Sequence, residues 1–389
     1  MDSIVTQIYT LSQSAGEEAQ REIQRALRQV QLDLRNPQEI LFDMGNSNLV
    51  VAMTRLGTDL GIFRDLAKHH GARTVDELCK LKGASPELLE RVLRYLAANG
   101  ILTQVASDGT NKYQANRVTY VLADPRGEGM TYHGFDVFGP TLQAVPDFFA
   151  ENKYQDITSN AHTPFQKAFN TELRCFDWLV QHPKQFDSLQ KVMTALESAE
   201  WTVGFDLFDA EAQKIPTAPP RACEKPFFVD VGGGHGHQCI ELGKRYPHLL
   251  GRLFLQDLPQ AIDQLPAIHG VQAEAYDFFQ KQPIVGAKFY YMRRILHDWP
   301  DNEAATILEN LSGAMAPDSR ILIDEVVLPD TGASWMATMN DISMMIAFGG
   351  KERTKKEWHA LADRAGLRVE HFHTYLAVYH TTITVLALK

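Results

Sequence analysis

A run of four glycines within five residues, at positions 232–236, constrains this chain more than any other feature. It follows the largely apolar run 227–231, which predicts a buried strand, and precedes residues 237–246, which predict a helix. Glycine adopts positive φ without strain and lets a ligand approach the main chain closely. Open α/β sheets bind ligands where strands end. The sequence therefore predicts such a sheet, with a ligand site at this loop.

The spacing of the glycines distinguishes two kinds of cofactor loop. The dinucleotide fingerprint G-x-G-x-x-G would need its third glycine where the chain has Cys239. The pattern Asp230-x-Gly232-x-Gly234-x-Gly236 fits without a gap and is typical of loops that bind S-adenosylmethionine. That cofactor has no phosphate and carries a sulfonium cation, so an adjacent carboxylate is tolerated. A tight strand-to-helix turn that binds no ligand is the alternative interpretation.

The composition limits the cellular partners. A length of 389 residues predicts two domains, and the net charge of -10 argues against a nucleic acid or an anionic membrane as the main partner. The first residues show no leader pattern and no run could span a bilayer, so we expect a cytoplasmic protein. The cysteines have no metal-binding spacing, and we expect neither a metal site nor disulfides; they are Cys79, Cys175, Cys223 and Cys239.

Residues 1–125 predict a mostly helical N-terminal domain. Helices are expected over residues 15–34 and 38–53. Two more are expected to begin at the capping box of Thr74 and Glu77 and at Ser85-Pro86. Two strands, at 101–104 and 113–121, are expected to form a hairpin across residues 107–109, so that the domain resembles a winged helix. A winged helix can bind DNA, but the acidic balance favours a structural or dimer-forming role.

Residues 126–389 predict the second domain. A helical, aromatic-rich region at 126–213 is expected to shape a substrate pocket, and a proline-rich linker at 214–226 leads to a cofactor-binding core from residue 227. Beyond the glycine loop, strands and helices alternate, which predicts a doubly wound, mostly parallel sheet. The expected strands are 253–255, 288–292 and 320–326, and the expected helices are 258–265 and 301–315. The β-branched runs 368–375 and 381–387 predict an antiparallel edge hairpin.

Acidic and aromatic residues that suit a nucleoside follow the predicted strands. Asp257 comes about 20 residues after the glycine loop, where an acid usually binds ribose hydroxyls. Asp277 and Phe278 suit the amino group and the ring face of an adenine. Both positions therefore extend the predicted cofactor site.

A candidate base lies at the same edge of the predicted sheet. His297 follows the strand 288–292, and a neutral imidazole can take a proton near pH 7 when a carboxylate orients it. Glu325, at the end of the next strand, and Glu352 are the carboxylates that we expect beside it.

Six short motifs together resemble one family. They are residues 229–236, Asp257-Leu258-Pro259, Asp277-Phe278-Phe279, His297-Asp298-Trp299, residues 325–329 and residues 349–354. In this order they are similar to the S-adenosylmethionine-dependent O-methyltransferases of the caffeic acid O-methyltransferase type, especially the fungal members of secondary metabolism. The resemblance spans most of the chain. It implies a Rossmann-like class I methyltransferase domain and an N-terminal domain that forms a homodimer and closes the back of the partner's substrate pocket.

The resemblance also implies roles for single residues. Gly232 and Gly233 match the loop under the methionine part of the cofactor, Asp257 matches the ribose-binding acid, and Asp277 and Phe278 match the adenine contacts. Arg293 stands where the family usually has a lysine near the cofactor. His297 matches the general base, and Glu325 and Glu352 match the carboxylates that hold it.

One departure bears on the acceptor. Plant members often have a pocket tryptophan where this chain has Arg294. A guanidinium there suits an oxygen-rich or anionic substrate. The alternative is that Arg294 pairs with an acid such as Asp298 and does not contact the substrate. We expect a phenolic or enolic hydroxyl on an aromatic or polyketide-type metabolite, with further contacts from His133, Phe176 and Met344.

Two other activities stay open. A related pericyclase or dehydratase could bind the cofactor without transferring methyl, with His133 and Arg294 clamping its substrate. A winged-helix regulator that senses the cofactor is the non-catalytic alternative. The set of His297, Glu325 and Glu352 favours methyl transfer over both.

Overall fold

The structure is a computed structural model that describes residues 2–107, 110–193, 200–217 and 225–389. It comprises two compact units, Met1–Phe135 and Asp136–Lys389. The predicted turn at Asp108-Gly109, Cys223 and the middle of the predicted linker lie outside the described residues. The domain boundary that we place after residue 125 stays a proposal.

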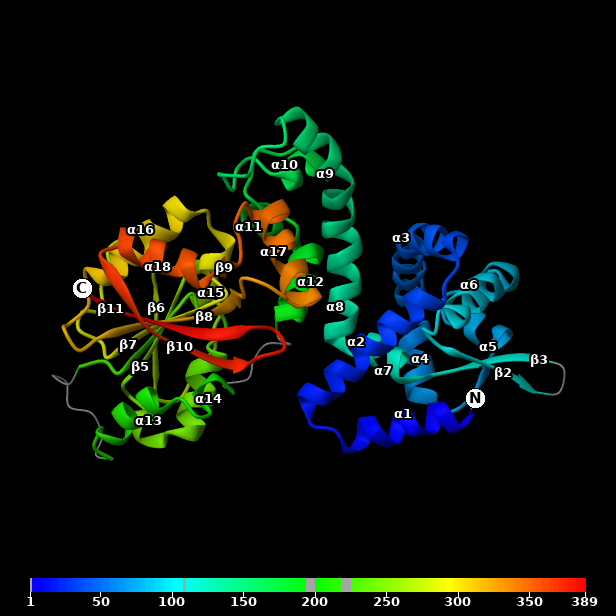
Figure 1. Cartoon of the computed structure of the whole chain (residues 1–389), viewed down its shortest axis with the longest axis horizontal. Helices are drawn as coiled ribbons and strands as arrows, with labels where there is room; N and C mark the ends of the chain where they lie inside the picture. The colour runs from blue at the N-terminus through cyan, green and yellow to red at the C-terminus, as the bar shows by residue number, and fades with distance from the viewer. Residues whose placement is uncertain (1, 108–109, 194–199, 218–224) are drawn as a thin grey trace. The chain divides into compact units, whose positions relative to one another are not determined.

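The N-terminal unit is mostly helical, with one small antiparallel sheet (Figure 1). Its helices are α1 Asp2–Ser14, α2 Glu17–Leu34, α3 Pro37–Asp59, α4 Ile62–His69, α5 Val75–Cys79, α6 Pro86–Ala98, α7 Arg117–Ala123 and α8 Pro125–His133. Its strands are β1 Arg73–Thr74, β2 Thr103–Ser107 and β3 Thr110–Gln114, in the order β1-β3-β2. Its core joins α4, α5 and α6 to the sheet, around side chains such as Phe63, Leu93 and Tyr113.

Side-chain caps begin several of these helices. Thr74 and Glu77 form the predicted capping box of α5, and Asn36 and Glu39 form another at the start of α3. The strand predicted over 113–121 is wrong beyond Gln114. The side chain of Asn116 accepts the backbone N–H groups of residues 118 and 119 and begins α7 instead. The likeness to a winged helix stays a prediction.

The second unit is a mixed α/β structure. After the π-helical turn η1 Gly134–Phe138, its helices are α9 Gly139–Glu151, α10 Pro164–Phe169, α11 Cys175–Val180, α12 Pro183–Met193, η3 Glu200–Thr202, α13 Asp206–Gln213, α14 His237–Arg245, η4 Pro247–Leu249, α15 Pro259–Ile262, η5 Leu296–Asp298, α16 Asp301–Ser312, α17 Trp335–Phe348 and α18 Lys355–Arg364. Its strands are β4 Phe228–Val231, β5 Leu253–Asp257, β6 Val271–Ala275, β7 Phe289–Arg293, β8 Arg320–Leu328, β9 Arg353–Thr354, β10 Leu367–Leu376 and β11 Thr381–Leu388.

The predicted doubly wound sheet is confirmed. Its order is β10-β11-β8-β7-β4-β5-β6, with β9 paired to β8, and Figure 1 shows helices on both of its faces. The strands from β8 to β6 run parallel. The strand β11 pairs antiparallel with both β8 and β10, which confirms the antiparallel edge hairpin predicted from the sequence. The pleat sends neighbours in β7 to opposite cores: Tyr290 and Met292 to one, Phe289 and Tyr291 to the other.

Two helices predicted from the sequence are shorter in the structure, and one strand was missed. The helix predicted over 258–265 is the single turn α15, and the helix predicted over 301–315 ends at Ser312. The strand β6 was not predicted. It lies at the edge of the sheet and has no buried side chain, so its sequence lacks the apolar run that marks a central strand.

Candidate active site

The glycine loop joins β4 to α14 at the carboxyl edge of the sheet. Gly232 and Gly234 adopt positive φ, 73° and 56°. A Cβ on Gly232 would lie 2.7 Å from Ile295, and one on Gly233 would lie 2.4 Å from the Asp230 carboxyl group. A Cβ on Gly234 would meet nothing within 4 Å. The loop therefore packs closely on one side and leaves open space beside its bare tip.

Two carboxylates support this loop. Asp257 accepts hydrogen bonds from the N–H groups of Gly234, at 2.8 Å, and Leu258, at 2.7 Å. Burial raises the pKa of Asp257, and these two bonds oppose the rise. Burial, and then the charge of Asp257, raises the pKa of Asp230 to about 7. The Oδ2 atom of Asp230 is buried without a hydrogen-bond partner. Such a pair of acids favours a cationic ligand.

The predicted adenine contacts lie in the connection after β6. Asp277 accepts the N–H of Phe279 at 3.0 Å, and the side chain of Asn310 donates to the Phe278 carbonyl at 3.1 Å. The half-buried Phe278 ring meets Trp299 edge to face, with ring centroids 5.9 Å apart. The connection therefore holds an aromatic ring in a fixed orientation.

Arg293 ends β7 in a buried polar cluster. Its Nε lies 3.5 Å from Asp324 Oδ2, and Asp324 also accepts the hydroxyls of Tyr291, at 2.6 Å, and Tyr375, at 2.8 Å. Burial alone would lower the pKa of Arg293, but Tyr291 and Asp324 raise it above its ordinary value. The guanidinium therefore stays charged beside Asp324 of β8, a carboxylate that the Tyr375 hydroxyl of β10 supports.

His297 lies in η5, directly after β7, and is buried. Its Nδ1 lies 2.7 Å from Glu352 Oε1, and its Nε2 lies 3.6 Å from Asp298 Oδ1. Asn340 of α17 donates to Glu352 Oε1, and Asp341 accepts the Glu352 N–H at 2.9 Å. The ring is therefore fixed at Nδ1 by a carboxylate that α17 holds in place.

The charges around His297 shift its titration. Burial alone would lower the pKa of His297, but Glu352 and then Asp298 raise it to about 9. Burial likewise opposes the ionisation of Glu352, yet the adjacent His297 holds its pKa below the ordinary value. Burial raises the pKa of Asp298 to about 7, against the effect of His297. The ring and Glu352 therefore form an ion pair at neutral pH.

Main-chain contacts fix the turn that carries His297. Glu325 does not meet the ring; its Oε1 accepts the N–H groups of residues 295, 296 and 297 at 3.1, 2.6 and 3.1 Å. The fully buried Arg353 donates to the carbonyls of Leu296, at 2.8 Å, and Trp299, at 2.9 Å. A Cβ on Gly350 would lie 1.9 Å from the His297 carbonyl oxygen. The loop that carries Glu352 can approach the His297 turn this closely only because residue 350 is glycine.

Three of the four candidate acceptor contacts lie in this unit, in two groups, and the fourth, His133, lies in the N-terminal unit. Arg294 has φ 56°, and its guanidinium lies 3.9 Å from Glu352 Oε1, the oxygen that also contacts His297. Phe176 of α11 packs on Phe348 with centroids 4.9 Å apart, and the buried Met344 belongs to the same apolar cluster. His133 is buried in the N-terminal unit at the end of α8, where burial lowers its pKa to about 4.

Several residues of this site were not predicted from the sequence. Asn340 and Asp341 lie in an apolar helix and form hydrogen bonds with Glu352. No local spacing in the sequence reveals these contacts. Arg353 adjoins Glu352 in the motif at 349–354, and this adjacency was the available signal.

Among the described residues, no group of three or more metal-ligating side chains is arranged around a common point. Within those same parts of the chain, no helix combines the length and the apolar character needed to cross a bilayer.

Comparisons with known proteins agree with this geometry. Residues 223–368 match the O-methyltransferase domain family, and residues 50–124 match the O-methyltransferase dimerisation domain family. Demethylsterigmatocystin 6-O-methyltransferase of Aspergillus flavus is 38% identical over 375 residues, which cover 96% of this chain and 95% of that protein. This similarity extends over both units.

Two solved structures share the fold over the whole chain. LepI in complex with SAM superimposes with a TM-score of 0.89 at 37% identity, covering 100% of this chain and 98% of that one. A structure described as a pericyclic reaction enzyme gives a TM-score of 0.89 at 37% identity, covering 100% and 99%. With the glycine loop, the paired acids and the buried histidine in place, the chain belongs to the S-adenosylmethionine-dependent O-methyltransferase family.

Proposed function

We propose that this enzyme methylates a phenolic or enolic hydroxyl of an aromatic or polyketide-type metabolite, with His297 as the general base. The observation that supports it best is the 2.7 Å contact between His297 Nδ1 and Glu352 Oε1 in a buried site. An ionised carboxylate only accepts hydrogen bonds, so the neutral ring keeps its proton on Nδ1 and presents the Nε2 lone pair. Nε2 is then the atom that takes the hydroxyl proton.

The residues around the glycine loop suit the cofactor. S-adenosylmethionine supplies a methyl group that its sulfonium already activates. The open space beside Gly234 and the unpartnered buried oxygen of Asp230 suit a ligand that carries positive charge. We assign its binding to Gly232, Gly233, Asp257, Asp277, Phe278 and Arg293. The chain then has to align the acceptor oxygen and remove its proton, and positioning accounts for much of the acceleration.

Arg294 and Phe176 define the proposed acceptor class. The Arg294 guanidinium near Glu352 suits an acceptor with a carbonyl or a second oxygen next to the reacting hydroxyl. The Phe176–Phe348 pair offers an aromatic face for a planar ring system. Glu325 positions the base by accepting the backbone N–H of His297. Met344 belongs to the same apolar cluster as Phe348, and His133 stays a predicted contact.

Substitution of His297 tests the base. His297→Ala should lower kcat by about 100- to 10,000-fold, the range that a positioned base contributes. The affinity for S-adenosylhomocysteine, measured by calorimetry, should stay unchanged. The matched control is His371→Ala, an exposed histidine on β10, which should keep normal turnover. Normal turnover by His297→Ala with intact cofactor affinity would contradict the assignment.

A pericyclase or dehydratase that binds the cofactor without consuming it is the second candidate. The similarity at 37% identity to a structure described as a pericyclic reaction enzyme favours it. The oriented His297–Glu352 pair supports methyl transfer, because a base of this kind is what removal of a hydroxyl proton needs. Product analysis separates the two: methyl transfer forms one S-adenosylhomocysteine per product, whereas ring closure or loss of water forms none.

The assembly and the location are also proposals. The match of residues 50–124 to a dimerisation domain supports a homodimer in solution. Fractionation of the producing cells would test the cytoplasmic location that the sequence predicts.

A further inference from the structure

Two buried glutamines belong to the segments around the proposed cofactor site and have no role in the contacts described above. Gln256 is the last residue but one of β5 and precedes Asp257, and its side chain is fully buried. Gln282 lies in the connection between β6 and β7 and is 5% exposed. A glutamine amide is rarely buried, because each of its polar atoms then needs a partner inside the protein.

The two amides form a reciprocal pair. Gln256 Nε2 donates to Gln282 Oε1 at 2.8 Å, and Gln282 Nε2 donates to Gln256 Oε1, also at 2.8 Å. Gln256 Nε2 donates in addition to Glu274 Oε1 at 2.7 Å, and Gln282 Oε1 accepts the Ile284 N–H at 3.0 Å. Each amide is bonded at both its oxygen and its nitrogen, so neither can rotate without breaking a hydrogen bond in the interior. The pair therefore fixes residue 282 against β5.

The main chain at Gln256 holds the glycine loop. Its carbonyl accepts the N–H groups of Gly232, at 2.8 Å, and Gly233, at 3.2 Å. The side chain of the following residue, Asp257, accepts the N–H of Gly234. Gln256 therefore bonds to the glycine loop through its main chain and to the connection after β6 through its side chain, so one residue joins two parts of the proposed cofactor site.

The connection after β6 is attached to β5 at both of its ends. At its start, the Tyr276 N–H donates to the Asp257 carbonyl at 2.8 Å. At its other end, Gln282 is held by the amide pair. Between these points the Gln280 N–H donates to the Asp277 carbonyl at 2.8 Å, which makes the intervening chain a compact turn. Two attachments fix both the position and the tilt of the turn that carries the predicted adenine contacts, whereas one would let it pivot.

We propose that Gln256 and Gln282 are positioning residues for the adenosine half of the cofactor. Their amide pair sets the separation between Asp257, assigned to the ribose, and the turn assigned to the adenine. This part of the site is then formed before the cofactor arrives, and binding is tighter because the turn does not have to be ordered during binding. Both side chains act through the residues that they hold. This inference rests on the cofactor-binding residues proposed above and deepens their assignment.

Substitution of Gln282 by methionine tests the pair. Gln282→Met nearly keeps the shape of the side chain and removes its amide. We expect the Kd of S-adenosylhomocysteine and the Kd of methylthioadenosine, measured by calorimetry on the full-length protein, to rise by the same factor of about tenfold. The two ligands share the adenosine half, and only the first carries an amino-acid half. KM for S-adenosylmethionine should rise in parallel with kcat unchanged, because the lost binding is common to the ground state and the transition state.

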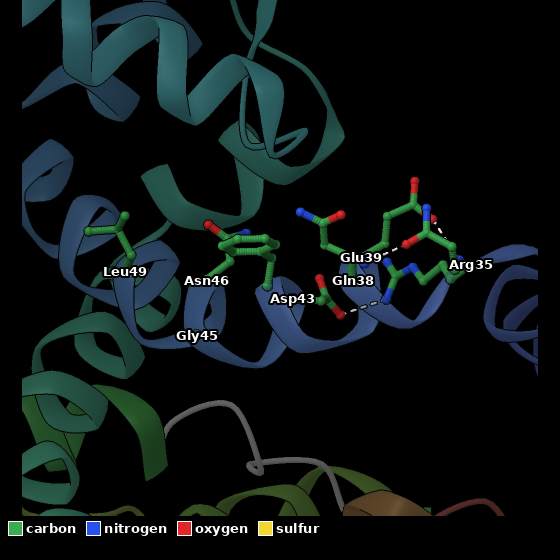
Figure 2. Close-up of a pocket in the computed structure, with 9 residues that line it drawn as sticks. Arg35, Gln38, Glu39, Asp43, Gly45, Asn46 and Leu49 are labelled. Carbon is green, nitrogen blue, oxygen red and sulfur yellow. Dashed lines mark hydrogen bonds and ion pairs between the residues drawn. The ribbon is translucent and has the colours of Figure 1, made fainter.

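An amide pair outside the catalytic unit provides the matched control. Asn46 of α3, beside the open groove shown in Figure 2, is half-buried and donates from Nδ2 to Asn99 Oδ1 at 2.7 Å. Asn46→Leu also removes one side of an amide–amide contact. It should lower the melting temperature and leave both Kd values unchanged.

A double variant separates the loss of the pair from the unpaired amide that a single substitution leaves in the interior. Gln256→Met/Gln282→Met removes both amides, so it should be at least as stable as Gln282→Met, and it carries the same test if the single variant does not fold. Its Kd values should lie within about twofold of those of Gln282→Met, since each single substitution already breaks the pair.

The outcomes separate the inference from the proposed function. Variants that unfold at a lower temperature but bind S-adenosylhomocysteine as the wild type does would show a purely structural pair, which overturns the inference and leaves the cofactor site standing. Weakening confined to S-adenosylhomocysteine would place the loss in the amino-acid half and would also refute the inference. A wild-type protein that does not bind S-adenosylhomocysteine would overturn the proposed cofactor site as well.

Discussion

The His297 imidazole lies between Glu352 at Nδ1 and Asp298 at Nε2, and this arrangement determines its response to pH. Its pKa of about 9 exceeds the ordinary 6.5, so the ring is protonated in the free enzyme at neutral pH. As the proposed base, the ring becomes able to accept a proton as pH rises toward 9. The stabilisation from the ion pair has the opposite dependence: it is complete below pH 6.5 and is lost as pH rises through 9.

The pH profile of kcat/KM tests this coupling. In the wild type, kcat/KM should rise with pH along a limb whose midpoint lies near pH 9, since this quantity reports the free enzyme. Glu352→Gln removes the main charge that raises the pKa, so the limb should move to lower pH. Its plateau should fall by about 100-fold, because the ring loses its orienting acceptor. An unchanged limb would show that His297 is not the titrating base.

A second residue-scale prediction concerns the glycine loop. Gly233→Ala places a methyl group 2.4 Å from the Asp230 carboxyl group, so the loop must move. We expect at least a tenfold weaker affinity for S-adenosylhomocysteine by calorimetry, a cost of about 1.4 kcal/mol or more. Gly134→Ala is the control, since its Cβ would meet nothing within 4 Å. Equal affinities in the two variants would count against a close cofactor approach at this loop.

At the scale of elements, β9 and η5 are joined by one buried cation. Arg353 donates to two carbonyls of the His297 turn and pairs with Asp301 at 2.9 Å. Arg353→Met would leave these acceptors unpaired in the interior, so we expect a loss of about 3–5 kcal/mol in the free energy of unfolding and a fall in kcat.

The control for this prediction lies on the neighbouring helix. Arg364 of α18 donates to Asn302 at 2.7 Å on the surface, and Arg364→Met should cost less than about 1 kcal/mol. Denaturant unfolding of both variants measures the difference. Similar small costs would mean that Arg353 does not hold the turn.

How far the sequence predicted the elements depended on their burial. The central strands β4, β7 and β8 are largely apolar and almost wholly buried, and all three were located. β6 is exposed at the sheet edge and was missed, and α7 was taken for a strand because the cap at Asn116 is a single residue. The pairing of His297 with Glu352 followed from the places of the two residues in the sequence and from the family resemblance. Asn340 did not, because residues 340 and 352 meet only through the tertiary fold.

At the scale of the whole molecule, the two compact units should respond differently to ligand. The glycine loop, the paired acids and His297 all belong to Asp136–Lys389. S-adenosylhomocysteine at 100 times its Kd should therefore stabilise this unit by about 2.7 kcal/mol and leave Met1–Phe135 unchanged.

Differential scanning calorimetry tests this prediction. We expect one transition to move to higher temperature with ligand and the other to stay. His297→Ala should keep the shift, since this residue is proposed to act on the acceptor, and Gly233→Ala should reduce it. A ligand that moved both transitions equally would show that the units unfold as one.

The contact of Gly350 with the His297 carbonyl has a consequence for how new specificities can arise. Main chain meets main chain there, so the base and its carboxylate form a unit that tolerates little change at residue 350. The apolar walls on α11 and α17 belong to a separate cluster and can vary independently. An engineer seeking a new acceptor should therefore diversify residues such as Phe176 and keep 349–353 constant, because the aromatic wall of α11 and the loop that carries Glu352 come from different stretches of the chain.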